Sequence, residues 1–372
     1  MVSDLFAWFI GSIDAHVCRR RVSMRVSIKD IARVAGVSHS TVSRALSDSP
    51  LVNAETKSRI QSLAREMGYS PDAQARSLVM GRTLTLGVVV TVLTDPFIAE
   101  IVQAIEDTAH EHGYSVVLAS SSAELEREIA AVEMLHSKRV DGVIVTSSRV
   151  GALYQRYLDR LGVPVVLINS HREEQGPYTF SVTVDNRHGG YLATSHLLQL
   201  GHQHIAYVTG PANHSDDLER MRGYCQALTE AGIEFQPELV VPGTGRVEGG
   251  ERAFLKLMKL KHPPSAVFCY NDMTAIGLLR AARLSGLSIP QDLSIVGFDD
   301  IPFASYVSPP LTTVAQPISQ MGWQAVKMVL ALIGDGEEGI GWVSNVIVQG
   351  RLIVRGSSGA RRDQKILSGG IS

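Results

Sequence analysis

Four polar side chains near the start of the chain share one face of a short helix and could bind the edges of nucleic-acid bases. The stretch HSTVSRAL at residues 39–46 places His39, Ser40, Ser43 and Arg44 together by helical spacing. An arginine guanidinium donates two parallel hydrogen bonds, which match the paired acceptors on the major-groove edge of guanine. Arg44 is therefore the expected main specificity contact, and His39 and Ser40 are expected to contact neighbouring bases.

Two short amphipathic helices joined by a tight turn must position this face. The first is expected to end before Gly36, and the second to begin after Ser38, whose hydroxyl can accept a free backbone N–H. A third helix is expected over about residues 54–67, with Asn53 as its N-cap. The apolar spacing predicts a shared core of Ile28, Ile31, Ala32, Ala35, Val42, Ala45, Leu46, Ile60, Leu63, Ala64 and Met67. This is the pattern of a helix-turn-helix that reads DNA. The alternative is a solvated helical hairpin with no DNA role.

The charge distribution favours a DNA contact. Residues 24–82 carry nine Lys or Arg against five Asp or Glu, a net charge of +4, whereas the whole chain has a formal net charge of −2. A net positive charge on the N-terminal segment, with a net negative charge on the rest of the chain, favours binding of that segment to backbone phosphates. The residues expected to contact DNA in this segment are Ser38, His39, Ser40, Thr41, Ser43 and Arg44.

Composition limits the possible classes. A chain of 372 residues with 45% hydrophobic content can hold two or three folded units. No stretch approaches the roughly 18 apolar residues of a membrane span. The cysteines, Cys18, Cys225 and Cys269, are far apart, which suits a reducing cytoplasm. In residues 1–23 a basic run follows a short apolar stretch, the reverse of a secretory signal. We therefore expect a disordered extension or an upstream mis-start, with Met24 as the initiator, and a disordered tail over residues 357–372.

Beyond residue 84, apolar strands alternate with helical segments. The expected strands are 85–92, 115–119, 142–146, 165–168, 181–184, 204–209, 239–241, 266–270 and 294–298. Near-continuous Val, Ile and Leu in such strands predicts parallel sheets covered on both faces. The segment is too long for one common sheet of this kind, so two lobes are expected. The predicted fold is thus an all-α helix-turn-helix headpiece followed by a two-lobed α/β domain with parallel sheets.

Polar residues that follow these strands are the candidate ligand contacts, because open parallel sheets bind ligands beyond the carboxyl ends of their strands. An Asn, Asp, Gln and Arg set beside an aromatic platform suits a polyol such as a sugar. The candidates are Phe97, Asn169, Arg220, Asn271, Asp299 and Gln316. Four of them have an alternative role. Asn271 and Asp299 could be helix caps, Arg220 a surface ion-pair partner, and Phe97 plain core packing.

The chain resembles the LacI family of bacterial regulators. The resemblance is carried by residues 27–46, Tyr69-Ser70-Pro71, Ala75-Arg76-Ser77-Leu78, Leu200-Gly201-His202, Val296-Gly297-Phe298-Asp299 and Pro309-Pro310-Leu311-Thr312-Thr313. It implies a DNA-binding domain over residues 24–71 and a hinge over 72–82 that becomes helical on operator DNA. Ala75 and Arg76 would contact the DNA, and Leu78 would wedge into the central base step. The alternative is that Leu78 is an ordinary linker residue.

The resemblance also implies that residues 83–356 resemble periplasmic sugar-binding proteins, with an effector between the lobes. The six candidate ligand contacts named above stand at the effector positions of the family. Two departures from the family pattern are visible. Where several members place an aromatic ring over the ligand, this chain has Gly243-Thr244-Gly245, and Asn169 replaces an acid found in some members.

The expected function is that of a cytoplasmic, homodimeric transcriptional regulator, most often a repressor. It would bind a pseudo-palindromic operator with an affinity controlled by a small, sugar-like effector. No cofactor, metal or membrane is expected. One alternative, a solute-binding protein without regulatory role, predicts a signal peptide and no DNA reader. The other, a sugar-modifying enzyme, needs a nucleotide motif. The stretch Gly243–Gly249 misses the dinucleotide spacing by one place, and His202 and His204 lack further metal ligands.

Overall fold

The computed structural model describes residues 26–69, 81–147, 162–169, 180–212, 214–334 and 345–361. The chain divides into two compact units, residues 1–81 and 82–372, which are described separately. The expectations for residues 1–23, for Ala75, Arg76 and Leu78 of the hinge, and for the tail beyond residue 361 lie outside the described residues. No helix in the described ranges is long and apolar enough to cross a membrane.

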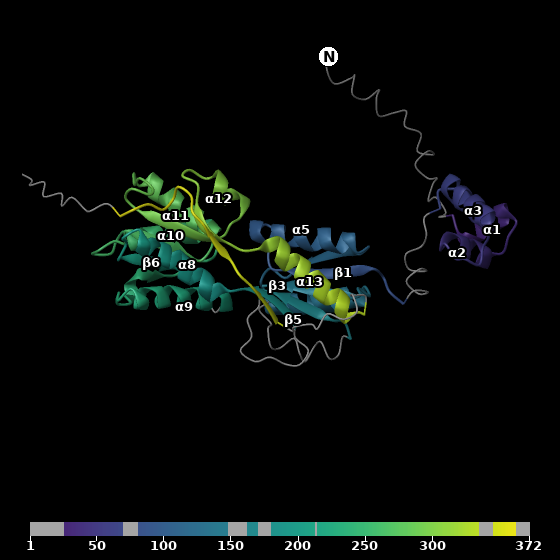
Figure 1. Cartoon of the computed structure of the whole chain (residues 1–372), viewed down its shortest axis with the longest axis horizontal. Helices are drawn as coiled ribbons and strands as arrows, with labels where there is room; N and C mark the ends of the chain where they lie inside the picture. The colour runs from purple at the N-terminus through teal and green to yellow at the C-terminus, as the bar shows by residue number, and fades with distance from the viewer. Residues whose placement is uncertain are drawn as a thin grey trace, which may run out of the picture. The chain divides into compact units, whose positions relative to one another are not determined.

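The described part of the first unit, residues 26–69, folds as three helices, drawn in purple in Figure 1. It consists of α1 (Ile28–Ala35), α2 (His39–Leu46) and α3 (Ala54–Glu66). Gly36 ends α1 in the left-handed conformation with φ +66°, which a glycine adopts without strain. Ser38 and Asn53 cap α2 and α3 by accepting the N–H groups of Thr41 and Thr56. The predicted helix-turn-helix is confirmed, caps included.

The core of this unit is made by the apolar face of each helix. Ile31, Ala32, Val42, Ala45, Ile60 and Ala64 are buried, and Ile28, Ala35, Leu46, Leu63 and Met67 pack against them. Val52, between α2 and α3, completes this core. Every apolar position expected from helical spacing therefore lies in or against the core.

The second unit holds two six-stranded sheets, one in each lobe. The sheet of the N-terminal lobe has the order β11-β5-β4-β3-β1-β2 and is wholly parallel. Its strands are β1 (Thr85–Val90), β2 (Ser115–Ser120), β3 (Gly142–Thr146), β4 (Val165–Ile168), β5 (Phe180–Val184) and β11 (Asn345–Val348). The helices α5 (Pro96–Glu111), α6 (Leu125–Ser137) and α13 (Ile318–Leu332) pack against this sheet. Helices α5 and α13 also pack on each other (Figure 1).

The C-terminal lobe has the sheet order β12-β10-β9-β8-β6-β7, in which only the β12–β10 pairing is antiparallel. Its strands are β6 (Ile205–Val208), β7 (Val240–Val241), β8 (Ala266–Cys269), β9 (Ser294–Asp299), β10 (Thr312–Ala315) and β12 (Arg351–Ile353). Helices α8 (Asn186–Gln199) and α9 (Ser215–Glu230) pack as one pair, and α10 (Val247–Leu257) and α11 (Asp272–Leu284) as another. The short η2 (Pro237–Leu239) and α12 (Pro302–Tyr306) complete the lobe. The predicted two-lobed α/β fold is confirmed.

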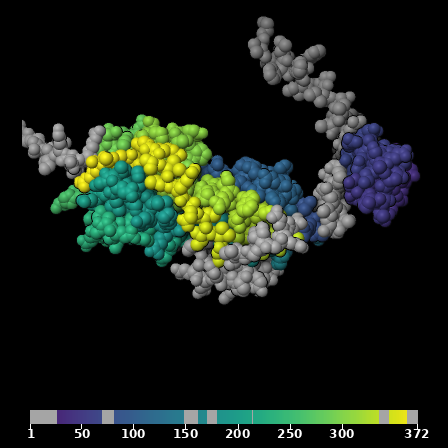
Figure 2. Space-filling view, in the orientation of Figure 1, coloured from purple at the N-terminus to yellow at the C-terminus, as the bar shows by residue number. Residues whose placement is uncertain are grey.

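The chain passes between the lobes three times in the described residues. The crossings lie between β5 and α8, between β10 and α13, and between β11 and β12. In Figure 2 the last of these segments, in yellow, runs over the surface of both lobes. Each lobe is consequently built from stretches that are distant in sequence, and the carboxyl ends of their strands meet at the space between them.

The structure differs from the sequence expectation at the C-terminal boundary. Residues 357–361 were assigned to a disordered tail, but Ser357 is fully buried. Its hydroxyl accepts the N–H of Thr312 and donates to the carbonyl of Ile295. Ser358 contacts His196, and Gly359 contacts His202. Glycine and serine are typical of disordered tails, but here these small residues pack closely against the C-terminal lobe.

Candidate DNA-reading helix and interlobe cleft

Helix α2 presents the polar face that its sequence predicts. His39, Ser40, Ser43 and Arg44 are exposed, while Val42 and Ala45 on the opposite side are fully buried. This division leaves the charged and hydroxyl side chains available for an external surface. Thr41 is half-buried, and its hydroxyl lies 2.8 Å from that of Ser38, so this pair stabilises the start of the helix.

The six side chains expected to contact a ligand all line one cavity between the two lobes. Its volume is about 400 Å³. Phe97 comes from α5, Arg220 from α9, and Asp299 from the end of β9. Asn169 follows β4, Asn271 caps α11, and Gln316 follows β10. The prediction that strand-end residues converge on one cleft therefore holds geometrically for the whole set.

Arg220 occupies the centre of the buried polar network. Helix α9, which carries Arg220, packs so closely on α8 that a Cβ at Gly190 would overlap the carbonyl oxygen of Arg220. The guanidinium lies between two rings, 3.6 Å from the centroid of Phe298 and 4.6 Å from that of Tyr270. Its Nε donates to Asn186 Oδ1 at 2.9 Å, and its Nη1 donates to the carbonyl of Tyr270 at 2.6 Å. With only 2% of its surface exposed, Arg220 is not the surface ion-pair partner of the alternative interpretation.

A chain of hydrogen bonds joins the two lobes beside Arg220. Asn169 Nδ2 donates to Gln316 Oε1 at 3.2 Å, and Gln316 Nε2 donates to Asp299 Oδ1 at 2.7 Å. The same carboxylate oxygen lies 3.9 Å from Arg220 Nη2. Asn169 and Asp299 both have positive φ angles, +49° and +114°, which are unusual for residues other than glycine. Such strain is typical of functional sites, where the surrounding structure holds it.

Burial gives Asp299 an unusual protonation equilibrium. It raises the pKa of this carboxyl to about 7, while Arg220 opposes the rise and the charges of Asp95 and Asp216 add to it. The neighbouring Asp272, fully buried, also has a raised pKa, mainly because burial disfavours its charged form. Near neutral pH the cleft thus holds a carboxyl group that is present in both protonated and ionised forms.

Two candidate residues have a structural role as well as a place in the cleft. Asn271 Oδ1 accepts the N–H and the hydroxyl of Thr274, and its Nδ2 donates to the carbonyl of Gly245. The helix-cap alternative is therefore correct for Asn271, although its side chain still lines the cavity. Phe97 also belongs to both settings, since it lines the cavity and is buried in the main core cluster.

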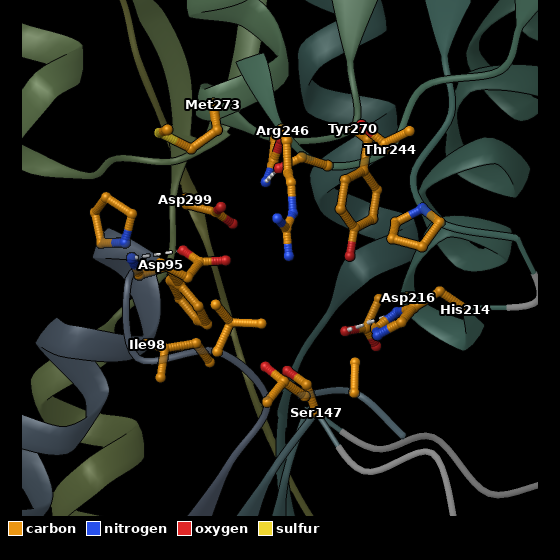
Figure 3. Close-up of a pocket in the computed structure, with 18 of the residues that line it drawn as sticks. Asp95, Ile98, Ser147, His214, Asp216, Thr244, Arg246, Tyr270, Met273 and Asp299 are labelled. Carbon is orange, nitrogen blue, oxygen red and sulfur yellow. Dashed lines mark hydrogen bonds and ion pairs between the residues drawn. The ribbon is translucent and has the colours of Figure 1, made fainter. Parts of the chain in front are cut away.

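Several side chains in the cleft were not singled out from sequence. Figure 3 shows the ring of Tyr270 directed into the cavity, with Asp95, Asp216, His214 and Ser147 around it. The sequence predicts Tyr270 as the last residue of a strand, whereas β8 ends one residue earlier, at Cys269. The aromatic surface that Gly243-Thr244-Gly245 does not provide is thus supplied by another segment.

The histidine pair that might suggest a metal site is structural. His202 is 3% exposed, and its ring nitrogens contact the hydroxyls of Ser265 and Ser294 and the carbonyl of Gly359. His204 contacts Gln236 and the carbonyl of Pro263. Within the described ranges no group of three or more His, Cys, Asp or Glu side chains is arranged to hold a metal ion.

Comparison with known proteins places both units. Residues 27–72 match the family model of bacterial regulatory proteins of the lacI family. Residues 83–349 match the model of periplasmic binding proteins and the sugar binding domain of the LacI family. The HTH-type transcriptional repressor CytR of Escherichia coli is 35% identical over 334 residues, which cover 90% of this chain and 96% of the relative. The repressor PurR of Aliivibrio fischeri is 35% identical over 312 residues, 83% of this chain and 92% of the relative.

Solved structures give the same result. The Lac repressor dimer bound to operator and the anti-inducer ONPF has a TM-score of 0.81 and 28% identity, and the match covers 90% of this chain and all of that one. The complex of the transcriptional regulator CelR with cellobiose has a TM-score of 0.67 and 31% identity, with the same coverage. These relatives are transcriptional regulators rather than enzymes. From its two matched units, the exposed polar face of α2 and the cleft between the lobes, we conclude that this chain belongs to the LacI family of bacterial transcriptional regulators.

Proposed function

We propose that this protein is a dimeric repressor in the cytoplasm, where its DNA lies, and that a small effector in the interlobe cleft controls its affinity for an operator. The observation that carries the proposal is the presence of two features on one chain. One is a recognition helix with an exposed polar face, and the other is a buried polar cavity between two lobes. A solute-binding protein has no use for the first feature.

On the DNA side, α2 enters the major groove. Arg44 is proposed to bind a guanine, with His39, Ser40 and Ser43 on neighbouring bases and Ser38 and Thr41 at the start of the helix. The proposed roles of Ala75, Arg76 and Leu78 rest on the family resemblance. There, a leucine wedge would cost a few kcal/mol of base stacking, and a bent operator with more protein contacts would offset it.

Dimerisation is proposed because one recognition helix reads only a few base pairs, and two half-sites multiply the specificity. Exposed apolar side chains on the effector-binding unit support pairing. Val117 and Leu118 lie on the edge strand β2, and Phe303 and Tyr306 lie on α12. Clusters of exposed apolar residues are typical of protein interfaces. The similar Lac repressor structure is itself a dimer on operator DNA.

The effector is proposed to be a sugar or a sugar-like molecule. The set of Asn169, Asp299, Gln316 and Arg220 offers the forked hydrogen bonds that adjacent hydroxyls accept and donate. Two similar structures contain sugars, the CelR complex with cellobiose and an Enterococcus faecium regulator with ribose. Because both lobes contribute to the cavity, a ligand there biases their relative orientation. Such coupling typically changes the affinity of the second site by about 1–3 kcal/mol.

The proposal is tested first by selecting bound sequences from random duplex DNA with the whole protein. We expect enrichment of an inverted repeat with two similar half-sites. An Arg44→Ala variant should lose enrichment at one position of each half-site. The matched control is Arg222→Ala, which removes an exposed cation from the other unit and should select the same repeat. A single half-site without symmetry would contradict the dimer, and no enrichment at all would contradict DNA reading.

A further inference from the structure

Three of the helices that begin at the cleft carry acidic or amide side chains at their N-termini. A helix N-terminus binds anions, because its free N–H groups and dipole favour negative charge. At α5, Asp95 Oδ1 accepts the N–H of Phe97 at 3.0 Å. At α9, Asp216 and Asp217 stand in the first turn, and at α11 Asn271 is followed by Asp272. At α5 and α11 the places where a ligand phosphate or carboxylate would bind are therefore filled by a carboxylate and an amide, and at α9 two carboxylates in the first turn oppose a further anion.

The buried charges in the cleft favour the same conclusion. Asp95, Asp216 and Asp299 line the cavity, and Figure 3 shows them around its central space. Arg220 is the buried cation that faces them, and Asn186, the Tyr270 carbonyl and Asp299 already engage its guanidinium. Arg246, which Figure 3 shows directed into the cavity, opposes the raised pKa of Asp95 and has the acidic Glu248 two residues away. Four acidic side chains therefore line the cavity with two arginines, one of which is already engaged, and this balance opposes the entry of a further negative charge.

One polar atom shows which hydrogen-bonding group the cleft requires. Asn169 is 3% exposed and lines the cavity, and its Oδ1 has no hydrogen-bond partner. A buried amide oxygen left unpaired is costly, so a bound molecule that donates a hydrogen bond to it gains that free energy. A phosphate oxygen is an acceptor and cannot do so, whereas a hydroxyl or amino group can.

We propose that the effector is uncharged in the part that enters the cleft and rich in hydroxyl or amino donors, and that the cleft rejects phosphorylated and carboxylated forms of the same molecule. Asn169 selects for a donor, and Asp95, Asp216 and Asp299 select against negative charge. This inference rests on the proposed function, since it concerns the chemistry of the effector in that same cleft.

The experiment uses matched pairs that differ by one phosphate. Calorimetric titration of the whole protein compares D-ribose with ribose 5-phosphate, D-glucose with glucose 6-phosphate, and adenosine and cytidine with their 5′-monophosphates. In every pair that binds, we expect the phosphorylated member to bind at least about tenfold more weakly, because like charges brought together in a desolvated site repel strongly. Equal or tighter binding of a phosphorylated member would overturn the inference and leave the proposed function intact. Absence of binding by both members of every pair would contradict the proposed function, and this inference with it.

Variants show whether the carboxylates cause the discrimination. Asp95→Asn and Asp216→Asn keep an acceptor for the hydrogen bonds that these side chains receive from Phe97 and Asn186, so the fold should be retained. We expect each to reduce the affinity ratio between the uncharged and phosphorylated members by at least about threefold. The control Asp107→Asn removes an exposed charge from the same helix as Asp95 and should leave the ratio unchanged. An unchanged ratio in both cleft variants would refute the role of these carboxylates.

Discussion

Replacing Arg220 with methionine should destabilise the effector-binding unit by about 3–5 kcal/mol, the usual cost of removing one partner of a buried ion pair. Methionine retains most of the volume but removes the charge and both of the hydrogen-bond donors described above, Nε and Nη1. Asn186 Oδ1 and the Tyr270 carbonyl would each lose a hydrogen bond in a buried setting, at about 1–3 kcal/mol for each acceptor. Asp299, with its pKa near 7, can take up a proton and so limit the cost of its own unpaired charge.

The measurement is urea denaturation of the whole protein, followed by circular dichroism and analysed for the unfolding of the larger unit. Arg222→Met is the matched control on the same helix. Its guanidinium is exposed and pairs with Glu219, so we expect a change within about 0.5 kcal/mol. A free energy of unfolding for Arg220→Met within the same range as the control would refute the reasoning.

A double variant separates the ion pair from the hydrogen bonds. In Arg220→Met with Asp299→Asn, no buried carboxylate is left facing the missing guanidinium. We expect the combined loss to be smaller than the sum of the two single losses by about 0.5–3 kcal/mol, the usual range for contacting residues. If the loss in the double variant equals the sum of the two single losses, the two groups, 3.9 Å apart, do not interact energetically.

Three further predictions concern separate features. Arg44→Ala should weaken binding to the selected operator by about 1–3 kcal/mol in a gel-shift titration at fixed salt, with effector binding retained; unchanged operator affinity would contradict its assignment. Asn53→Ala should lower the stability of the three-helix unit by about 1 kcal/mol, because the N–H of Thr56 loses its acceptor, and calorimetry would detect this loss. The third concerns pH. Asp299 has a raised pKa in the folded state, so that state holds its proton where the unfolded chain does not, and the contribution to stability falls as pH rises from about 4 to about 7. Asp299→Asn should flatten this fall in thermal unfolding measured across that range, and an identical pH profile would disprove the assignment.

Much of the fold could be predicted from the chain, because its periodicities are strong. The three helices of the first unit follow from apolar spacing and from side-chain caps such as Ser38, and the expected strands of the two lobes lie within two residues of the observed ones. The nine expected strands do not include β10, β11 or β12, of which the last two have four and three residues and are partly exposed. Strands that short and that exposed carry no clear alternation, and only their pairing partners specify them.

The candidate site was predicted where a rule of topology applies and missed where the chain bends locally. The strand-end rule placed Asn169 and Asp299 in the cleft. It did not reveal Asp216, which reaches the cleft from the first turn of a helix, nor Tyr270, which was expected to belong to the strand itself. The two roles of Asn271 could not be separated from sequence, because a residue between a strand and a helix can both cap the helix and line the cavity.

The three crossings between the lobes have a consequence for how the protein is made. The N-terminal lobe needs α13 and β11, which come after most of the C-terminal lobe in the chain, so neither lobe is complete when its first strands leave the ribosome. At about 5–20 residues per second, the first five strands wait roughly 8–30 s for the segment that ends at β11. During that interval β5 lacks its outer neighbour. The core of the small helical unit is made by residues 26–69 alone in the part of the chain that the structure describes, so a nascent chain can form its DNA-reading helix before it has a closed cleft to control it.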